Sequence, residues 1–339
     1  MKKFKSISEI LAFILAFLTA ILLFGYSFKI NPFQEATELS TWKVPNAGEA
    51  AEAYFSPDSK TLICNAKGEG DSTYLVYTIN IDGTNKKRIC DQGETACSFF
   101  HPDGKMIIWT STRDHLDLPK GSFSVPKDYP QGAELYTSDL DGNNIKRLTY
   151  NEYYDAEVSY SWDGSKILFS RQIDGLVDLW VMNADGSDQH QITFTPGWQE
   201  GGAFYLHDNQ TILFRAWKIE DEAQRGMPMT IFTIKDDGSE LKQITHEAGT
   251  NWAPFPSPDD KYFVFTKVLP GKNYEIFLMS METGEQTRLT YNDAFDGFPV
   301  ISPDGKLMTF SSNRDAAPGN RALTLYLMDL SSFNFGVSY

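Results

Sequence analysis

The 339-residue sequence contains little cysteine and an excess of acidic over basic residues. Cys64, Cys90 and Cys97 show no C-x-x-C spacing, which argues against a zinc or haem attachment site. We expect them to be small buried core residues, with a Cys90–Cys97 disulfide as the alternative. The formal net charge of −15 opposes binding to phosphate backbones, so we expect no nucleic-acid partner.

The signatures of common enzyme classes are also missing. No G-x-S-x-G elbow is present, and H-E-A-G-T at 246–250 does not complete a zinc-binding H-E-x-x-H helix. The five histidines are scattered along the chain, at His101, His115, His190, His207 and His246. We therefore expect no catalytic residue, no cofactor and no metal, with His207 beside His190 or His246 as the alternative for a metal site.

A long apolar run occurs at the N-terminus. Residues 10–26, ILAFILAFLTAILLFGY, carry no charge and follow three lysines. This length lies where a signal-peptide core of roughly 7–15 residues and a spanning helix of roughly 17–25 overlap. We interpret 1–30 as one hydrophobic helix, which is an uncleaved membrane anchor or, alternatively, a signal segment. Residues 31–37 would form a linker. Either interpretation places the following residues outside the cytoplasm, in the periplasm.

One turn sequence recurs along the chain, typified by S-P-D-G-K at 302–306. Related turns occur at 56–60, 101–105, 161–166, 206–210 and 257–261. The second residues of the six copies are Pro57, Pro102, Trp162, His207, Pro258 and Pro303. They are separated by 45, 60, 45, 51 and 45 positions, and a period near 45 with occasional insertions is typical of a β-propeller.

Strand-like segments surround each turn in a fixed order. In the third copy, AEVSY precedes the turn, and KILFSR, DLWVMN, the hairpin signal Asp185-Gly186 and HQIT follow it. Four strands in each of six repeats predict an all-β, six-bladed propeller of four-stranded blades over 38–330. Residues 331–339 would then form a C-terminal tail.

The sixth repeat lacks its last strand. The segment ELSTW at 38–42 aligns with RLTYN at 147–151 and 288–292, so we expect 38–42 to complete the last blade. Such a join removes the open sheet edges that an array of blades would otherwise leave.

The S-P-D-G-K turns, the LYxMDxDG run and the R-L-T strands resemble the TolB-like propeller family over about 38–330. The resemblance implies a six-bladed propeller of the kind found in envelope proteins, in the non-catalytic part of some peptidases and in oligogalacturonate lyases. TolB carries an N-terminal α/β domain, whereas only about ten residues here separate the apolar run from the first strand, so we expect that domain to be absent. Lyases of this scaffold use clustered His and Gln, and no such cluster is evident.

Candidate binding residues lie where each innermost strand begins. Seven positions before each turn marker stand Ala50, Thr95, Asp155, Glu200, Asn251 and Asp296, with Glu49 and Glu94 one step earlier. These positions predict a mostly acidic ring at the channel mouth, which would bind a cation or a basic peptide. The alternative is structural: Asp155 would face Arg171, Glu200 Arg215, Asn251 Lys267 and Asp296 Arg314, as cross-strand pairs.

Two long insertions, 114–132 and 218–228, both fall between the second and third strands of their repeats, so we expect them on one face. Binding residues concentrate on such loops. The candidate partner contacts are Lys127, Asp128, Tyr129, Trp198, Arg225 and Trp252. Aromatic residues on the loops between blades, including Tyr153, Tyr154 and Phe295, either grip a partner or cap the blades.

These observations favour a non-catalytic, membrane-anchored extracytoplasmic propeller that acts as a protein-binding scaffold or accessory subunit of an envelope complex. The expected partners are a protein and, through the N-terminal helix, the membrane. The alternative is a propeller that binds or cleaves carbohydrate, in the manner of an oligogalacturonate lyase.

Overall fold

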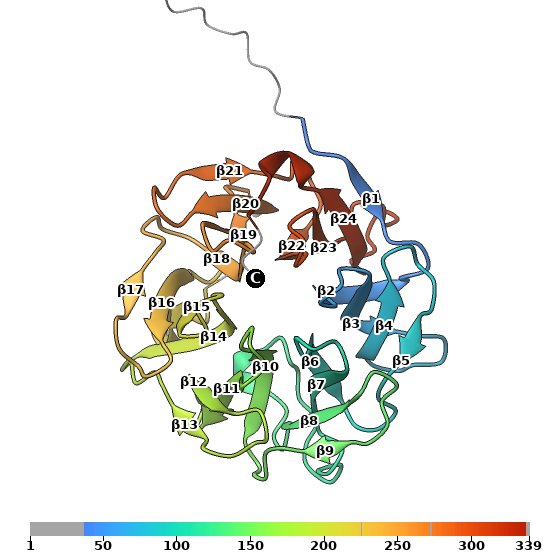
Figure 1. Ribbon diagram of the computed structural model, residues 1–339, viewed down its shortest axis with the longest axis vertical. Coiled ribbons are helices and arrows are strands. Elements are labelled where there is room, and N and C mark those ends of the chain that lie inside the picture. The colour runs from blue at the N-terminus through green and yellow to red at the C-terminus, as the bar shows by residue number, and fades with distance from the viewer. Residues whose placement is uncertain (1–36, 225, 272, 337–339) are drawn as a thin grey trace, which may run out of the picture. The chain divides into compact units, whose positions relative to one another are not determined.

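The computed structural model describes residues 37–336, apart from 225 and 272. These residues form six four-stranded antiparallel sheets, and Figure 1 shows them arranged around a common axis. The expected all-β, six-bladed propeller is thereby confirmed. The expected N-terminal helix (1–30) lies outside the described residues. No helix in the described part of the chain is long and apolar enough to span a membrane.

Each of the first three blades follows the chain from the channel outward. Blade 1 contains β2 (Glu49–Phe55), β3 (Thr61–Lys67), β4 (Leu75–Asn80) and β5 (Lys87–Arg88). Blade 2 contains β6 (Thr95–Phe100), β7 (Met106–Ser111), β8 (Glu134–Asp139) and β9 (Lys146–Arg147). Blade 3 contains β10 (Tyr154–Tyr160), β11 (Lys166–Ile173), β12 (Leu176–Asn183) and β13 (His190–Gln191).

The remaining blades keep this order, except at the last position of blade 6. Blade 4 contains β14 (Trp198–Tyr205), β15 (Thr211–Lys218), β16 (Thr230–Lys235) and β17 (Lys242–Gln243). Blade 5 contains β18 (Asn251–Pro256), β19 (Tyr262–Val268), β20 (Tyr274–Ser280) and β21 (Gln286–Arg288). Blade 6 contains β22 (Asp296–Ile301), β23 (Leu307–Ser312), β24 (Thr324–Asp329) and β1 (Thr41–Lys43).

The ring closes where β1 pairs with β24, and Figure 1 shows the two strands side by side. The strand lies at Thr41–Lys43, so the expected alignment of 38–42 with R-L-T-Y-N is wrong by five residues. Lys43 pairs with Tyr326 in the way that Arg288 pairs with Phe277 in blade 5. The physical reason is burial: this register places Val44, which is fully buried, where blade 5 buries Leu289.

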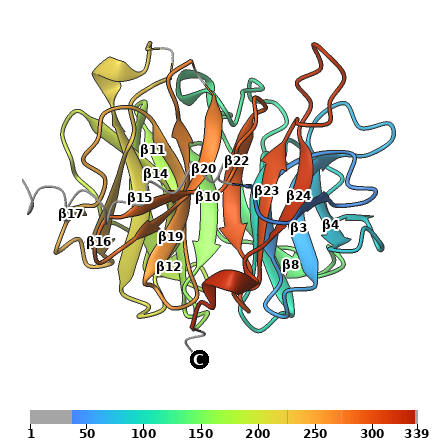
Figure 2. The ribbon, with the colours of Figure 1, turned by 90° about the horizontal axis from the view of Figure 1, so that it is seen from above.

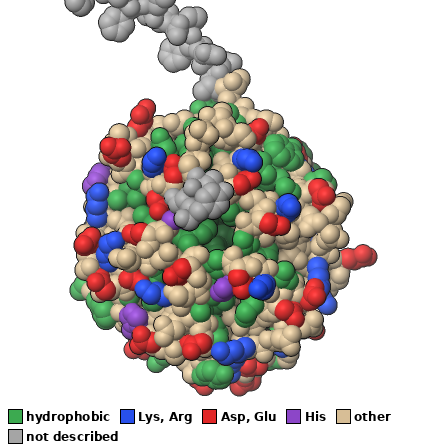
Figure 3. Space-filling model, in the orientation of Figure 1, with side chains coloured by type: hydrophobic (Ala, Val, Ile, Leu, Met, Phe, Trp, Pro, Cys, Tyr) green, Lys and Arg blue, Asp and Glu red, His purple; other side chains and the backbone are tan. Residues whose placement is uncertain are grey.

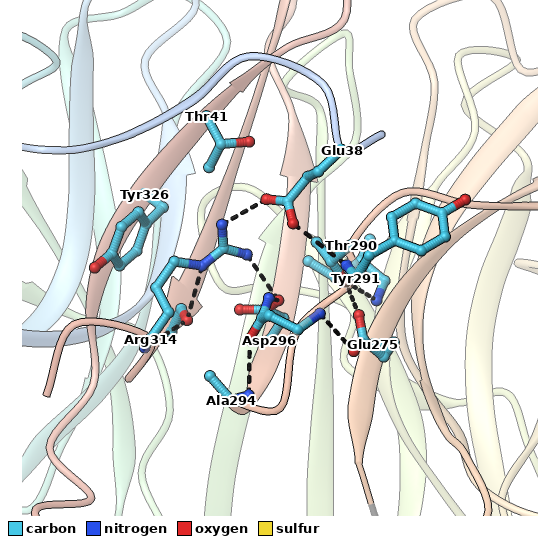
Figure 4. Close-up of polar contacts among 12 residues, drawn as sticks. Glu38, Thr41, Glu275, Thr290, Tyr291, Ala294, Asp296, Arg314 and Tyr326 are labelled. Atoms are coloured by element: carbon cyan, nitrogen blue, oxygen red, sulfur yellow. Dashed lines mark hydrogen bonds and ion pairs between the residues drawn. The ribbon is translucent and has the colours of Figure 1, made fainter. Parts of the chain in front are cut away.

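Glu38 contributes to the closure through charge rather than through strand pairing. Its carboxylate contacts Arg314 at 2.5 Å, and Arg314 also binds Asp296 of β22 at 2.7 Å, as Figure 4 shows. The backbone N–H of Tyr291 donates to the same carboxylate at 3.3 Å. The chain that enters the propeller is therefore tied both to blade 6 and to the loop that follows blade 5.

The recurring turn sequence is explained by its hydrogen bonds. The Ser302 hydroxyl donates to Asp304 at 2.6 Å and accepts the Leu307 N–H at 2.9 Å, and the Asp304 carboxylate accepts the Lys306 N–H at 3.1 Å. The fourth turn position has positive φ in all six copies: Ser59, Gly104, Gly164, Asn209, Asp260 and Gly305. Glycine recurs there because it adopts this conformation without steric cost.

The threonine of the R-L-T segments has an equally local role. Thr149, Thr193, Thr245 and Thr290 accept the backbone N–H groups of Leu135, Leu179, Ile231 and Ile276 at 2.9–3.0 Å. In blade 1 this position is Cys90, and the Val76 N–H donates instead to Thr95 of blade 2. The threonines thus continue the hydrogen bonding of the third strand just beyond the short outermost strand.

The propeller has two unlike faces. We call the side with the S-P-D-G-K and Asp-Gly hairpins the tight-turn face, and the opposite side the loop face. Figure 2 shows the insertions 114–132 (green) and 218–228 (yellow) on the face opposite the short helix at Ser331–Phe333 (red), which confirms that they share one face. They contain the short 3-10 helices η1 (Pro126–Asp128) and η2 (Ile219–Asp221). Figure 3 shows acidic and basic side chains interspersed over the other face.

Apolar side chains fill the spaces between neighbouring blades. One cluster joins Ile63 of blade 1 to Phe100 and Trp109 of blade 2. The three cysteines are buried and free, so the alternative of a Cys90–Cys97 disulfide is wrong. The described part of the expected C-terminal tail is packed: η3 (Ser331–Phe333) leads to Phe335, which is buried against Tyr262.

Candidate functional site: the channel cavity on the loop face

Each innermost strand carries a β-bulge, and the bulges define the channel. One residue of each bulge has left-handed backbone geometry: Glu52, Cys97, Glu157, Gly202, Ala253 and Phe298, with φ between 48° and 56°. Register shifts mark the same positions in all six inner hairpins. A bulge re-aims a side chain, and all six residues line the channel cavity.

An aromatic layer lies two residues further along four of these strands. The Tyr54 ring centroid lies 5.2 Å from Phe99 and 5.6 Å from Phe204, and Phe204 lies 4.9 Å from Phe255. These rings come from blades 1, 2, 4 and 5 and meet across the channel. Tyr54, Phe204 and Phe255 of this layer line a cavity of about 670 Å³ that lies toward the loop face.

The walls of the cavity come from both insertions and from the inner strands. Phe123 and Tyr129 belong to the first insertion, and Met227 belongs to the second. Trp252 and Phe298 add two further rings, 4.4 Å apart in an edge-to-face arrangement. The volume lies in the usual range for small-ligand sites, and the mixture of aromatic walls with few polar groups is typical of them.

An ion pair at the cavity wall joins blades 3 and 4. Arg215 binds the Glu157 carboxylate at 2.6 Å, and the Gly202 N–H donates to Glu157 at 2.6 Å. A Cβ at Gly202 would overlap the Arg215 guanidinium, and one at Gly201 would overlap the Glu157 carboxylate. The Gly201-Gly202 pair therefore makes room for this buried ion pair.

Glu52 faces the same cavity without such a partner. Its carboxylate accepts the Asn65 side-chain N–H at 2.8 Å and the Tyr54 hydroxyl at 3.4 Å, and no described cation bonds to it. Burial raises the pKa of Glu52 to about 7; the nearby Glu157 charge adds to this effect and Arg215 opposes it. Glu52 thus changes charge near neutral pH.

The ring expected at the channel mouth is wrong in its accessibility, because Thr95, Asp155, Glu200, Asn251 and Asp296 are all buried and at most 2% exposed. The reason is the bulge, which turns the residue two positions later into the channel instead. Among these five residues, only Thr95 reaches the cavity wall. Ala50 is buried as well.

The alternative of cross-strand neighbours is correct for Asp155, Asn251 and Asp296 and wrong for Glu200. Asp155 binds Arg171 through both carboxylate oxygens, at 2.6 and 2.8 Å, and Asp296 binds Arg314. Glu200 opposes Ala216, because the expected register with Arg215 is one residue off. Asn251 does oppose Lys267, but Lys267 binds Glu247 and Asn251 donates to the Met229 carbonyl.

The acidic residues of this set differ in their environment. Burial and the charge of Asp178 raise the pKa of Glu200 to about 8. Burial also raises the pKa of Asp296. Glu49 binds Tyr74 at 2.7 Å and Lys67 at 3.4 Å; the Tyr74 hydrogen bond is the main cause that lowers the pKa of Glu49. Glu94 lines the cavity, and its Oε2 atom has no described hydrogen-bond partner.

The candidate partner contacts divide into exposed and buried residues. Lys127 and Asp128 are exposed, and Lys127 lies 3.8 Å from Glu222, so the two insertions approach each other. Tyr129 is only 7% exposed and stacks on Tyr154 at 4.1 Å, so it forms cavity wall rather than an exposed anchor. Trp198 is half-buried against Phe232. Arg225 lies outside the described residues.

Two of the described histidines, His101 and His207, pack in the tight turns. His207 binds Asp260 at 2.8 Å and stacks on Trp162 at 4.0 Å, which links the tight turns of blades 3, 4 and 5. His101 packs edge-on against Tyr160. Within residues 37–336, excluding 225 and 272, no three His, Cys, Asp or Glu side chains are grouped closely enough to hold a metal ion.

Glu94, Tyr129 and Trp252 of the sequence-based candidates do line the cavity, whereas Glu52, Glu157 and Arg215 were not among the candidate binding residues. A signal for Glu52 and Glu157 was present, because Glu52, Cys97, Glu157, Gly202, Ala253 and Phe298 repeat with the same spacing as the turn markers. The adjacent glycines at 201 and 202 were a second signal, since two glycines in an inner strand often mark a bulge or a close approach.

Comparison with known proteins agrees with the fold. By its fold and its site, this protein belongs to the class of six-bladed β-propellers with a ligand-sized cavity in the channel. No family model matches the chain. An uncharacterized protein of Agrobacterium fabrum is 26% identical over 282 residues, covering 78% of this chain and 84% of that protein. A TolB homolog of Chlorobium luteolum is 26% identical over 160 residues, which is 46% of this chain and 33% of the homolog.

Solved structures support the same fold. A TolB candidate from Agrobacterium tumefaciens matches 86% of this chain and 97% of its own, with 20% identity and a TM-score of 0.58. An oligogalacturonate lyase in complex with manganese matches 88% and 95%, with 15% identity and a TM-score of 0.56. The resemblance to TolB-like propellers is confirmed: the chain is a six-bladed β-propeller, similar in sequence to a TolB homolog and in fold to a TolB candidate. It spans about a third of the length of the TolB homolog.

Proposed function

We propose that this chain is a non-catalytic, membrane-anchored propeller of the periplasm that binds a protein partner through its loop face. In this role it is a scaffold or accessory subunit of an envelope complex. The apolar run at 10–26 supports the anchor, because it follows lysines and is long enough to span a bilayer. The likeness to TolB homologs supports the location and the binding role.

The observation that carries the proposal is the cavity of about 670 Å³ bounded by both insertions. The insertions interrupt the regular repeat only on the loop face, and the ion pair of Lys127 with Glu222 connects them at the mouth. A partner segment that enters the cavity would bury aromatic rings, which contribute strongly to protein interfaces.

A lyase acting on acidic sugars is the second candidate, because oligogalacturonate lyases share the fold. The charges of the cavity oppose it. The described charged residues that line the cavity are Glu52, Glu94, Glu157 and Arg215. Three carboxyl groups against one guanidinium disfavour a polyanionic substrate, since like charges across a site weaken binding.

The test is capture of the partner from gently solubilised membranes with the full chain as bait. Replacing 114–132 by a short Gly-Ser turn should leave the propeller folded and abolish the complex, because this segment lies outside the repeat. A matched pair of charge reversals refines the test. Lys127→Glu on the loop face should weaken the complex, whereas Lys261→Glu on the tight-turn face should not; their side chains are 72% and 75% exposed. A complex that survives the loop replacement but is lost with Lys261→Glu would contradict the proposal.

A further inference from the structure

The cavity contains polar atoms that the described part of the protein leaves without partners. Asn65 Oδ1 and Glu94 Oε2 are buried acceptors without a hydrogen bond, and Arg215 Nε is a buried donor without one. All three residues line the cavity. A buried polar atom without a partner costs free energy, so native proteins seldom keep several in one place unless a ligand or water satisfies them.

The charges differ between the two sides of the cavity. On the side of blades 3 and 4, Glu157 is neutralised by Arg215 at 2.6 Å. On the side of blade 1, the described hydrogen-bond partners of the Glu52 carboxylate are Asn65 and Tyr54, and no described cation bonds to it. A ligand cation beside Glu52 would supply the missing counter-charge, and its N–H groups would reach an acceptor at Asn65.

The walls favour the same chemistry. The rings of Tyr54, Tyr129, Trp252 and Phe298 line the cavity, and a cation is attracted to aromatic faces by the ring quadrupole. A quaternary cation would benefit from the rings but could not donate to Asn65. A primary ammonium group uses both the rings and the unpartnered acceptors.

We propose that this cavity binds an α-amino group, meaning a primary ammonium beside Glu52 and Asn65 with its neighbouring carbonyl oxygen accepting from Arg215. The carbonyl would satisfy the Nε donor, which a simple alkylamine would leave unpaired. Such a group occurs at the amino terminus of a partner polypeptide or in a free α-amino compound. If the amino group belongs to a partner polypeptide, this inference rests on the proposed function. The recognition of an α-amino group by the cavity residues does not depend on that function.

The experiment is calorimetric titration of the full chain in mild detergent with four probes. These are L-alaninamide, tetra-alanine amide and the N-acetyl form of each. We expect each free amine to bind at least tenfold more tightly than its acetylated form. Tighter binding of the tetrapeptide would assign the site to a polypeptide terminus, and equal or weaker binding would assign it to a small α-amino compound. Equal affinities of free and acetylated probes would overturn the proposal. So would the absence of binding at 10 mM probe, since a Kd of 10 mM corresponds to a binding free energy of about −2.7 kcal/mol.

Variants locate the binding. Glu52→Gln keeps the shape but removes the charge and should weaken amine binding more than tenfold, whereas Glu52→Asp keeps the charge and should stay within about fivefold. Glu285→Gln, an exposed carboxylate on the tight-turn face, changes the net charge equally and should have no effect beyond twofold. Unchanged binding in Glu52→Gln would overturn the proposal.

The two proposals fail in different ways. Loss of the captured complex on replacement of 114–132, with no amine binding, would refute only the amine site. Amine binding that depends on Glu52, with no complex captured, would refute only the protein-binding role.

Discussion

The two faces of this propeller are built from the same repeated blades, but they use their sequence differently. On the tight-turn face, the third-position aspartate accepts a backbone N–H in all six turns, and the left-handed fourth position is held by Gly, Ser, Asn or Asp. On the loop face, the six left-handed bulge positions hold residues as different as Glu52, Gly202 and Phe298. The backbone repeats at both ends of the channel, whereas the side chains repeat at only one.

This difference separates stability from binding. Side chains that recur in most blades, such as the turn serines and the R-L-T threonines of four blades each, satisfy backbone groups of the blade itself. The bulge residues point into the cavity, where Glu52 lacks a described counter-charge and Arg215 keeps an unpartnered donor. Changes in the repeated set should therefore lower stability, and some changes in the cavity should raise it.

The largest effect should come from opening the ring. A chain that begins at residue 45 lacks β1 and Val44, exposes the edge of β24 and loses the Glu38–Arg314 ion pair. Relative to a chain that begins at residue 31, we expect about 3–5 kcal/mol lower unfolding free energy. Thermal melts of the two purified chains measure it. Equal melting temperatures would show that β1 does not hold the ring closed.

A cavity glycine should have the next largest effect. Gly202→Ala places a Cβ on the Arg215 guanidinium and strains a backbone with φ of 56°, so we expect about 2–4 kcal/mol of destabilisation. Gly175→Ala is the control, because Gly175 also has positive φ but open space around its Cβ. Denaturant unfolding of both variants separates the steric part from the conformational part. The explanation fails if the two variants lose the same stability.

Replacing Glu52 should raise the unfolding free energy, whereas the two changes above lower it. Its folded-state pKa of about 7 lies above the ordinary value of 4.5, so the folded state holds its proton more tightly than the unfolded state. The Glu52 contribution therefore destabilises the fold as pH rises from 4.5 to 7, and fully so above pH 7. We expect Glu52→Gln to raise the unfolding free energy by about 1–3 kcal/mol at pH 8 and by under about 1 kcal/mol at pH 5.

Melting curves across this pH range test that prediction, with Glu285→Gln as the control of equal charge change. A gain that did not depend on pH would mean that packing, rather than the buried charge, caused it.

The smallest effect concerns the repeated threonines. Thr245→Val leaves the Ile231 N–H without its acceptor at a fully buried position, which should cost about 1–2 kcal/mol. Thr287→Val in β21 is exposed and should change stability by under about 0.5 kcal/mol. Equal unfolding free energies of the two variants in chemical denaturation would contradict the role assigned to Thr245.

The sequence by itself determined the repeated part of this protein. The period near 45, the Ser-Pro-Asp-Gly-Lys turns and the R-L-T threonines specify local hydrogen bonds, and local bonds can be derived from residue types and spacing alone. The all-β class, the six blades and the common face of the two insertions followed from them. The closing strand was found in the right region, but its register depended on burial of Val44, which short alignment does not measure.

Only the tertiary structure decided which side chains face the cavity. One extra residue in each inner strand reverses the alternation of sides, so Asp155 is buried against Arg171 while Glu157 enters the channel. The pairing of Glu157 with Arg215 joins blades 3 and 4. Glu52 and Asn65 of blade 1 line the same cavity as Arg215 of blade 4. These contacts depend on how blades pack around the axis, and the local pattern of a strand contains no information about its partner across the channel.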